Sequence, residues 1–386
     1  MTFHYLNNAG AGLMSPRTLK TIIDYLNLEV EVGAYRAARE SKSQMDLFYE
    51  RATGLVNGSH PNEIAFVDSA SRAWNMALYG VELGHGDQIV TLSTEFGTNL
   101  VSLFYHARQV GAAVQVVQCD ATGNFDLDKF SYYLKGGDRC LVAISHAAMQ
   151  GSIVNPVKDI GRLAKEHGAI YLLDGCQAAG QIPIDVNSIQ CDVYTTTGRK
   201  WLRGPRGTGF LYVKNTSSLK ANQVDLAAAD LVLEEEFRSA ELMVTGVDVR
   251  KDARQFELWE RSVAGMLGLS NAMSEYLEQG RDAVAKRIQT LANRLRKEVS
   301  ANTNLTLVGQ VESESGVVGF YVNDPKRENL VREKFEQGAV EISTVSNWDC
   351  PLHFPRTGVT SIFRLSPHHY TPDLSVDVAC EILAKI

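Results

Sequence analysis

The chain lacks the features that mark secreted, membrane and nucleic-acid-binding proteins. None of its 386 residues falls in an uninterrupted apolar run of the ~18 positions needed to cross a bilayer. The N-terminus has neither the basic start nor the apolar segment of a signal peptide. A net charge of −7 and a pI near 5.8 provide no general basic surface. We therefore expect a cytoplasmic protein without nucleic-acid or membrane partners.

Cysteine is present, but not in the paired spacing of a disulfide framework or a thiolate zinc site. The six cysteines contain no CxxC motif and are scattered along the chain. His368 and His369 are adjacent, yet the sequence near them offers no further metal ligands. We therefore predict no metal site. A hydrophobic content of 45% and a charged content of 22% are typical of ordinary globular proteins.

Strands and helices alternate through the first two thirds of the chain. Short apolar strands are predicted at 64–67, 88–92, 114–118, 140–145, 169–173, 192–195 and 209–213, with helices at 72–81, 99–110 and 157–166 between them. This alternation predicts an α/β fold with a mostly parallel, doubly wound sheet. We assign residues 14–250 to this large domain, whose first helix begins at Ser15 and Pro16.

The remaining sequence predicts a smaller α+β domain. A long helical stretch covers 263–299, and strands are predicted at 305–307, 317–322 and 362–365. We assign residues 251–386, with the N-terminal segment 1–13, to this second domain. Because no Pro- or Ser-rich linker separates the two parts, we expect them to pack closely.

Two chemically suggestive side chains follow neighbouring strands of the large domain. Asp174 ends the apolar run at 170–173, and Lys200 comes 26 residues later, after one further strand. The carboxyl ends of parallel strands share one edge of a sheet, so both side chains can meet there. An acid facing a pyridinium nitrogen and a lysine that reaches an aldehyde are what pyridoxal 5'-phosphate requires. Asp174 could instead cap the next helix.

A phosphate site is predicted where the first strand of the sheet gives way to a helix. Ser69, Ala70 and Ser71 offer hydroxyls and backbone amides at that turn, and Thr197 adds a hydroxyl close to the lysine. A serine-rich turn is also a common plain helix cap. Near the C-terminus, Arg364 has the planar donor fork that binds a carboxylate in two places, although a lone arginine is more often an ion-pair residue.

These motifs, in this order, resemble the class V aminotransferase family of fold-type I pyridoxal phosphate enzymes, which includes cysteine desulfurases. The resemblance is carried by DGCQ at 174–177, TTTGRK at 195–200, GPRGTG at 204–209 and FRLSPHHYT at 363–371. It extends over nearly the whole chain. It implies a fold-type I architecture, a pyridoxal phosphate cofactor, an amino-acid substrate and a homodimer.

The resemblance also implies roles for particular residues. Lys200 would bind the cofactor aldehyde as a Schiff base and Asp174 would pair with the ring nitrogen. The other implied contacts are Gln177 to the ring oxygen, Ala70, Ser71 and Thr197 to the phosphate, Arg364 to the substrate carboxylate, and the segment with Asn8 and Ala9 lining the substrate pocket.

Several positions depart from the cysteine desulfurase pattern. Arg199 stands where a histidine usually precedes the lysine, and Phe96 replaces the ring-stacking histidine, so we take Phe96 as the stacking candidate. The segment 256–262, where a partner subunit usually supplies a phosphate-binding threonine, contains none. Cys350 lies 14 residues before Arg364, close to the persulfide cysteine of desulfurases, but the Arg-Thr-Gly that normally precedes that cysteine is missing.

The segments GAYRAARE, DSASRAW and FELWERS resemble the branch with hercynylcysteine sulfoxide lyase, cystine lyase and isopenicillin N epimerase-like proteins. Our leading hypothesis is therefore a carbon–sulfur lyase that releases pyruvate and ammonia from a cysteine-derived amino acid. The alternatives are desulfuration through Cys350, and transamination or epimerisation of an amino acid. A relative that has lost catalysis is a further alternative, and cofactor uptake would discriminate it.

Overall fold

A seven-stranded sheet forms the centre of the larger part of the molecule. The computed structural model describes residues 3–215, 218–235, 242–354 and 359–386. Neighbouring strands in this sheet are parallel except around β8, which is antiparallel to both its neighbours. In spatial order the strands are β2 (Ile64–Val67), β8 (Gly209–Val213), β7 (Val193–Thr195), β6 (Ile170–Asp174), β5 (Cys140–Ser145), β3 (Gln88–Leu92) and β4 (Ala113–Val117). The predicted mostly parallel α/β fold is confirmed.

The central strands are apolar along their whole length because both faces of the sheet are covered. Successive side chains of a strand point to opposite faces, and Leu172 and Leu173 accordingly belong to two different hydrophobic clusters. Both leucines are fully buried, which stabilises the fold by roughly 2 kcal/mol for each side chain. The strand order then brings the ends of β5, β6 and β7 together at the carboxyl edge.

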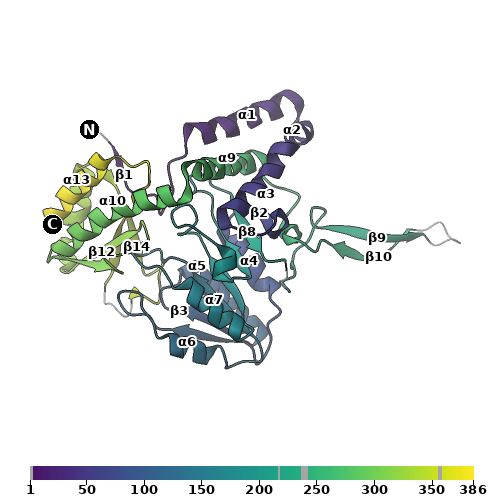
Figure 1. Ribbon diagram of the computed structural model, residues 1–386, viewed down its shortest axis with the longest axis horizontal. Coiled ribbons are helices and arrows are strands. Elements are labelled where there is room, and N and C mark those ends of the chain that lie inside the picture. Colours follow the sequence, from purple (N-terminus) through teal and green to yellow (C-terminus); the bar gives the residue numbers. More distant parts are fainter. Residues whose placement is uncertain (1–2, 216–217, 236–241, 355–358) are drawn as a thin grey trace.

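Helices on both faces connect these strands (Figure 1). Those between strands of the sheet are α4 (Ala70–Gly80), α5 (Gly97–Val110), α6 (Leu127–Tyr133), α7 (Val157–Glu166) and α8 (Val186–Ile189). Single-turn 3-10 helices lie at Pro61–Glu63, Ala253–Phe256 and Pro325–Arg327. The helix expected from Ser15 starts there, because the Ser15 side chain accepts from the amide of Thr18. It is α1 (Pro16–Val32), followed by α2 (Ala34–Glu40) and α3 (Lys42–Val56).

The smaller, C-terminal part is an antiparallel sheet covered by helices, as the α+β prediction required. Its strands run in the order β11 (Leu305–Val308), β12 (Val318–Val322), β15 (Ser361–Leu365), β14 (Ser343–Ser346). The helices are α9 (Val263–Gln279), α10 (Arg281–Ala301), α11 (Glu328–Gln337) and α13 (Asp373–Ala384). The long helix expected over 263–299 is broken at Gly280, whose φ of 85° an L residue rarely adopts.

The N-terminal and C-terminal sequences pack against each other. Strand β1 (His4–Tyr5) pairs in parallel with β13 (Val340–Glu341). Helix α9 packs against α1 and α3, as Figure 1 shows. The domain division at residues 13 and 250 stays a prediction.

Two buried charges hold irregular segments. Glu257 accepts from the Tyr49 hydroxyl (2.8 Å), the Phe66 amide (2.8 Å) and the Arg261 guanidinium (2.5 Å). Arg296 has no exposed surface and donates to the carbonyl oxygens of residues 311, 313 and 315 at 2.6–2.9 Å. Hydrogen bonds therefore compensate both charges for the loss of water, as burial of a charge requires.

A two-stranded hairpin that the sequence did not predict extends away from the body (Figure 1). It consists of β9 (Ala229–Glu235) and β10 (Leu242–Val249). Leu233 opposes Val244 and Leu231 opposes Val247 in the register, so these four side chains share one face. They are 52–61% exposed. An isolated hairpin is at best marginally stable, so a further contact on this face would stabilise the hairpin.

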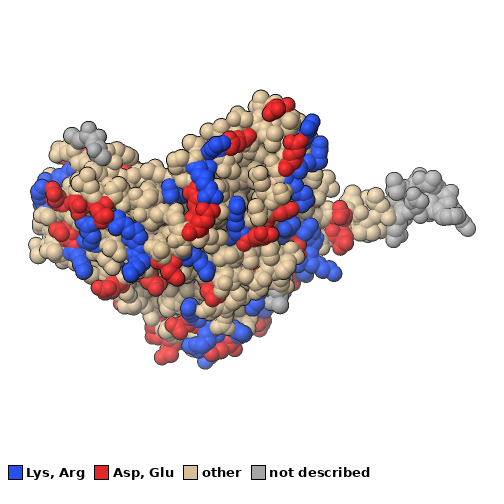
Figure 2. Space-filling model, turned by 45° about the horizontal axis from the view of Figure 1, so that its top comes forward, with Lys and Arg blue, Asp and Glu red and all other residues tan. Residues whose placement is uncertain are grey.

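The surface carries both signs of charge. On the face in Figure 2, basic and acidic side chains are interspersed. Among the described residues, no helix is both long and apolar enough to span a membrane.

Candidate functional site

A cavity of about 180 Å³ opens at the carboxyl edge of the central sheet. Strands β5 and β6 end at wall residues, Ser145 and Asp174, and the wall also contains Ser69 and Thr197, which lie two residues after the ends of β2 and β7. Seven of the residues predicted from the sequence lie in this wall, namely Ala70, Ser71, Phe96, Asp174, Gln177, Thr197 and Lys200. The geometry thus brings together side chains that are up to 131 positions apart in the chain, from Ser69 to Lys200.

Asp174, the last residue of β6, is 6% exposed and held by neighbouring donors. Its Oδ1 accepts from the Cys176 amide (2.9 Å) and the Thr195 hydroxyl (3.3 Å). Its Oδ2 accepts from the Asn99 side chain (2.9 Å). A carboxylate has about four acceptor positions, so Asp174 retains capacity for one more donor from the cavity.

Lys200 lies in the loop between β7 and β8 and is half-buried. Burial lowers the pKa of its amine, Cys176 opposes this shift, and the Arg199 guanidinium adds to it. The loop is braced by the N-terminal segment, because the Gly12 amide donates to the Arg199 carbonyl (2.7 Å) and Arg199 donates to the Gly10 carbonyl. A lysine held this way is a better nucleophile than a solvated one.

The N-terminus of α4 borders the same cavity. The Ser69 hydroxyl caps this helix by accepting from the Arg72 amide (3.2 Å). The first amides of a helix, here those of Ala70 and Ser71, have no partner within the helix. Together with Thr197 across the cavity, they suit a phosphate group.

Gln177 connects the cavity to the N-terminal segment. Its Oε1 accepts from the Trp201 indole (2.9 Å) and its Nε2 donates to the Ala9 carbonyl (3.1 Å). Asn8 is fully buried, donates to the Ser366 carbonyl (2.7 Å) and accepts from a tyrosine hydroxyl. Asn8 and Ala9 therefore lie behind the cavity wall, and their role as substrate contacts stays a prediction.

Arg364 lies on β15, at the side of the cavity that Met149 lines. It is 5% exposed and donates to the Ser343 hydroxyl and the Met149 carbonyl, both at 3.0 Å. Burial lowers its pKa to about 10, and Cys350 and Asp349 oppose this shift. The guanidinium is thus a fixed cation at neutral pH. Arg364 does not line the cavity itself, but it bonds to Met149, which does.

Cys350 is fully buried and packs in a small hydrophobic cluster with Ile153 and Phe354. Its Sγ donates to the Gln150 side chain at 3.4 Å. Burial raises the pKa of this thiol, and the neighbouring Asp349 adds to the shift. The structure places Cys350 near Arg364 but outside the cavity wall.

Sequence reasoning missed part of the wall, including Asn99, Ser145 and Cys176. It also missed Glu95, a buried carboxylate that bonds to two of these residues. The available signal was the spacing of Glu95 and Asn99, four residues apart where a strand gives way to a helix. Glu95 lies just before the N-cap of α5 and Asn99 in its first turn, where the two side chains meet.

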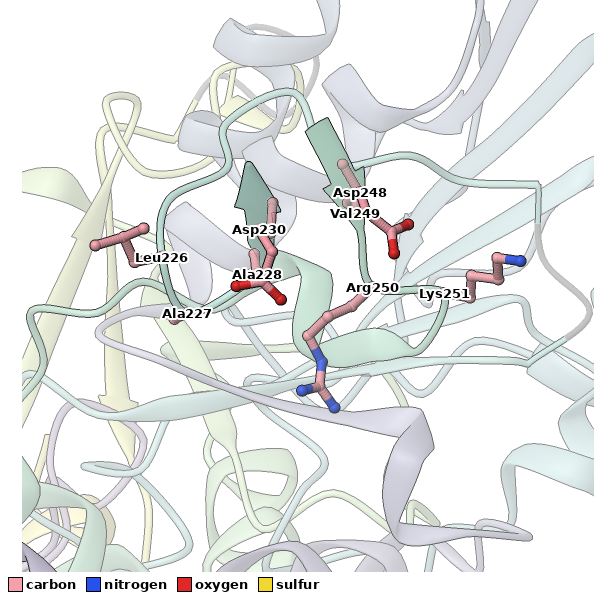
Figure 3. A pocket seen from close by; sticks show the side chains of 9 residues that line it. Leu226, Ala227, Ala228, Asp230, Asp248, Val249, Arg250 and Lys251 are labelled. Atoms are coloured by element: carbon pink, nitrogen blue, oxygen red, sulfur yellow. The ribbon is translucent and has the colours of Figure 1, made fainter. Parts of the chain in front are cut away.

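A second hollow, of about 380 Å³, lies at the root of the hairpin and is shown in Figure 3. It is lined by residues 226–230 and 248–251. Asp230 and Asp248 oppose each other there, but both are exposed. Within the described ranges, no three His, Cys, Asp or Glu side chains gather as a metal site would require. We assign the chemistry to the first cavity.

The first cavity fits pyridoxal 5'-phosphate. It offers a lysine with a lowered pKa, a carboxylate with spare acceptor capacity and an unpaired helix N-terminus in one enclosure. These are the three separate contacts by which the cofactor's aldehyde, ring nitrogen and phosphate would be held.

Comparison with known proteins gives matches over almost the whole chain. The family model of the aminotransferase class-V family matches residues 4–378. A probable cysteine desulfurase of Methanothermobacter thermautotrophicus is 25% identical over 92% of this chain and 86% of its own length. A cysteine desulfurase of Yersinia pestis is 28% identical over 75% of this chain and 70% of its own.

Solved structures share the fold. The cysteine desulfurase of Thermococcus onnurineus superposes with a TM-score of 0.85 at 20% sequence identity. The match covers 99% of this chain and 94% of the desulfurase chain. The cystine C–S lyase C-DES, in complex with its product cysteine persulfide, has a TM-score of 0.85 at 20% identity, with 99% and 97% covered.

Proposed function

The chain belongs to the aminotransferase class-V family and is a pyridoxal phosphate-dependent enzyme, and from this premise we propose that it cleaves the carbon–sulfur bond of cysteine or a cysteine derivative. The observation that carries the proposal is the meeting of Lys200 and Asp174 in one cavity with the N-terminus of α4. The relatives named above act at the same kind of bond.

Each residue has a task that follows from its surroundings. Asp174, held by Asn99, would accept a hydrogen bond from the ring nitrogen, and the amides at the start of α4 would bind the phosphate. When bound, the cofactor withdraws electrons from the substrate's α-carbon. Lys200 would hold the cofactor aldehyde until the substrate amine replaces it. Burial favours the uncharged form of Nζ, which could then take up and return the α-proton. Arg364 attracts the substrate carboxylate.

The relatives favour desulfuration over the pyruvate-forming lyase that the sequence led us to expect first. The curated relatives compared above are described as cysteine desulfurases. In that reaction the Cβ–Sγ bond of cysteine breaks, the sulfur passes to a thiol, and the carbon skeleton takes up a proton to give alanine. Cys350 would be the acceptor thiol.

One observation favours elimination as the second candidate. The Cys350 thiol is buried, hydrogen-bonded to Gln150 and raised in pKa, whereas sulfur transfer needs an accessible thiolate. In elimination the sulfur leaves with the bonding electrons, and water converts the remaining skeleton to pyruvate and ammonia. Such a reaction needs no acceptor cysteine in the protein.

Product analysis separates the two. The purified protein with pyridoxal phosphate is given cysteine or cystine, and alanine, pyruvate and protein persulfide are measured. All products should vanish in Lys200→Ala. Alanine formation that vanishes in Cys350→Ala supports desulfuration, and pyruvate that persists in Cys350→Ala supports elimination. Cys140→Ala, which changes a buried thiol at the start of β5, is the matched control. A folded holoprotein that forms neither product from any cysteine derivative refutes the proposal.

We also propose a cytoplasmic homodimer. The structure places none of the six cysteines in a disulfide, which suits a reducing compartment. The exposed aliphatic face of the β9–β10 hairpin offers surface for a second copy. Light scattering at several concentrations tests the dimer, and a monomer throughout would contradict it.

A further inference from the structure

The side chain of Asn99 lies between two buried carboxylates. Its Nδ2 donates to Asp174 Oδ2 (2.9 Å) and to Glu95 Oε1 (2.8 Å). The exposed fractions of these residues are 3% for Asn99, 6% for Asp174 and 1% for Glu95. An amide nitrogen carries two hydrogens, so each carboxylate takes one of them.

Glu95 is itself fixed by the ends of two strands and the start of α5. Its Oε1 also accepts from the Phe96 amide (2.9 Å) and the Ser145 hydroxyl (2.6 Å), and its Oε2 accepts from the Ser145 amide (2.6 Å). Burial raises the pKa of Glu95 to about 7, the Ser145 hydrogen bond opposes this shift, and Asp174 adds to it. Cys350 is the other titratable group on which Glu95 acts.

This arrangement determines how Asp174 faces the cavity. An asparagine amide has one donor end and one acceptor end, and only the donor end attracts carboxylates. Glu95 holds that donor end in place, so Asn99 presents nitrogen to Asp174. With Oδ1 held by Cys176 and Thr195, rotation of the Asp174 carboxylate is blocked.

We propose that Glu95 and Asn99 are positioning residues that hold Asp174 against the cofactor's ring nitrogen, and that Glu95, when ionised, places a second negative charge behind it. A buried negative charge stabilises a cation at the ring nitrogen, because the screening by water is weak there. The inference rests on the pyridoxal phosphate cofactor and does not depend on which carbon–sulfur reaction follows.

The protonation of the ring nitrogen tests this directly. The holoprotein is prepared with cofactor labelled with ¹⁵N in the ring, and the nitrogen chemical shift is followed against pH in wild type, Glu95→Gln and Asn99→Ala. Losing a hydrogen bond to a charged group should lower the ring nitrogen's proton affinity roughly tenfold, or about one pH unit. The dissociation constant for the cofactor should rise in parallel. Asn155→Ala is the matched control, since Asn155 is equally buried and bonds to the Ser145 carbonyl (2.7 Å).

Three results would overturn the proposal. The first is a wild-type nitrogen titration in variants that fold and bind cofactor. The second is an equal shift in Asn155→Ala, which would indicate a general packing effect. The third is lost turnover with an unchanged titration. If Asn99→Ala fails to fold, Asn99→Ser decides, because its hydroxyl is too short to bridge the carboxylates. A shifted titration in a protein that cleaves no carbon–sulfur bond would support this inference while refuting the proposed function.

Discussion

Cys350 should react with iodoacetamide far more slowly than Cys380 in the native protein. Cys380 is partly exposed, and burial raises its pKa to about 11. At about pH 8, roughly one Cys380 thiol in a thousand is therefore ionised. Cys350 has a larger upward pKa shift from burial and no exposed surface. Fewer thiolates and the need for local opening together predict modification at least ~100-fold slower than that of Cys380.

The assay is a time course of alkylation with peptide mapping, and complete alkylation in urea serves as the control. Modification of Cys350 as fast as that of Cys380 would refute the argument from burial. Repeating the time course with cysteine present makes the result informative about function. Selective acceleration at Cys350 would mean that substrate exposes this thiol, as desulfuration requires.

Three further changes have defined outcomes. Arg364→Lys should raise KM for the amino acid roughly tenfold or more, since lysine lacks the bidentate fork, with an unchanged cofactor absorbance band; an unchanged KM would argue against carboxylate binding. The rate of cofactor uptake by the apoprotein should rise with pH as Lys200 loses its proton, with a midpoint below the usual lysine value. In Arg199→Gln that midpoint should move upward, because a neighbouring cation is removed; a downward shift would contradict this. Glu257→Ala leaves Arg261 without its partner and should lower the free energy of unfolding by about 3–5 kcal/mol in urea titrations, and a loss below ~1 kcal/mol would contradict the assigned pairing.

The predictable part of the site follows from a rule that acts locally. Asp174 and Lys200 come directly after predicted parallel strands, and such strands end at one edge, so their convergence could be expected. Arg364 lies on a strand of the other sheet. Its position beside Met149, and so beside the cavity, depends on how the two sheets pack. Nothing local in the sequence encodes that packing.

The unpredicted elements have physical reasons as well. The bridge from Glu95 through Asn99 joins β3, α5 and β6, so it depends on strand order, which periodicity does not give. The β9–β10 hairpin exposes aliphatic side chains in place of the usual alternation of buried apolar and solvated polar residues, so its strands lacked the pattern expected of a half-buried pair.

A buried cation holds the middle of the loop between β11 and β12. The carbonyl oxygens of residues 311, 313 and 315 converge on the guanidinium of Arg296, much as oxygen ligands surround a bound metal ion. The ion is here part of the chain and is carried by α10, so it cannot dissociate or be chelated. The loop therefore has a permanent internal partner for three of its carbonyl oxygens.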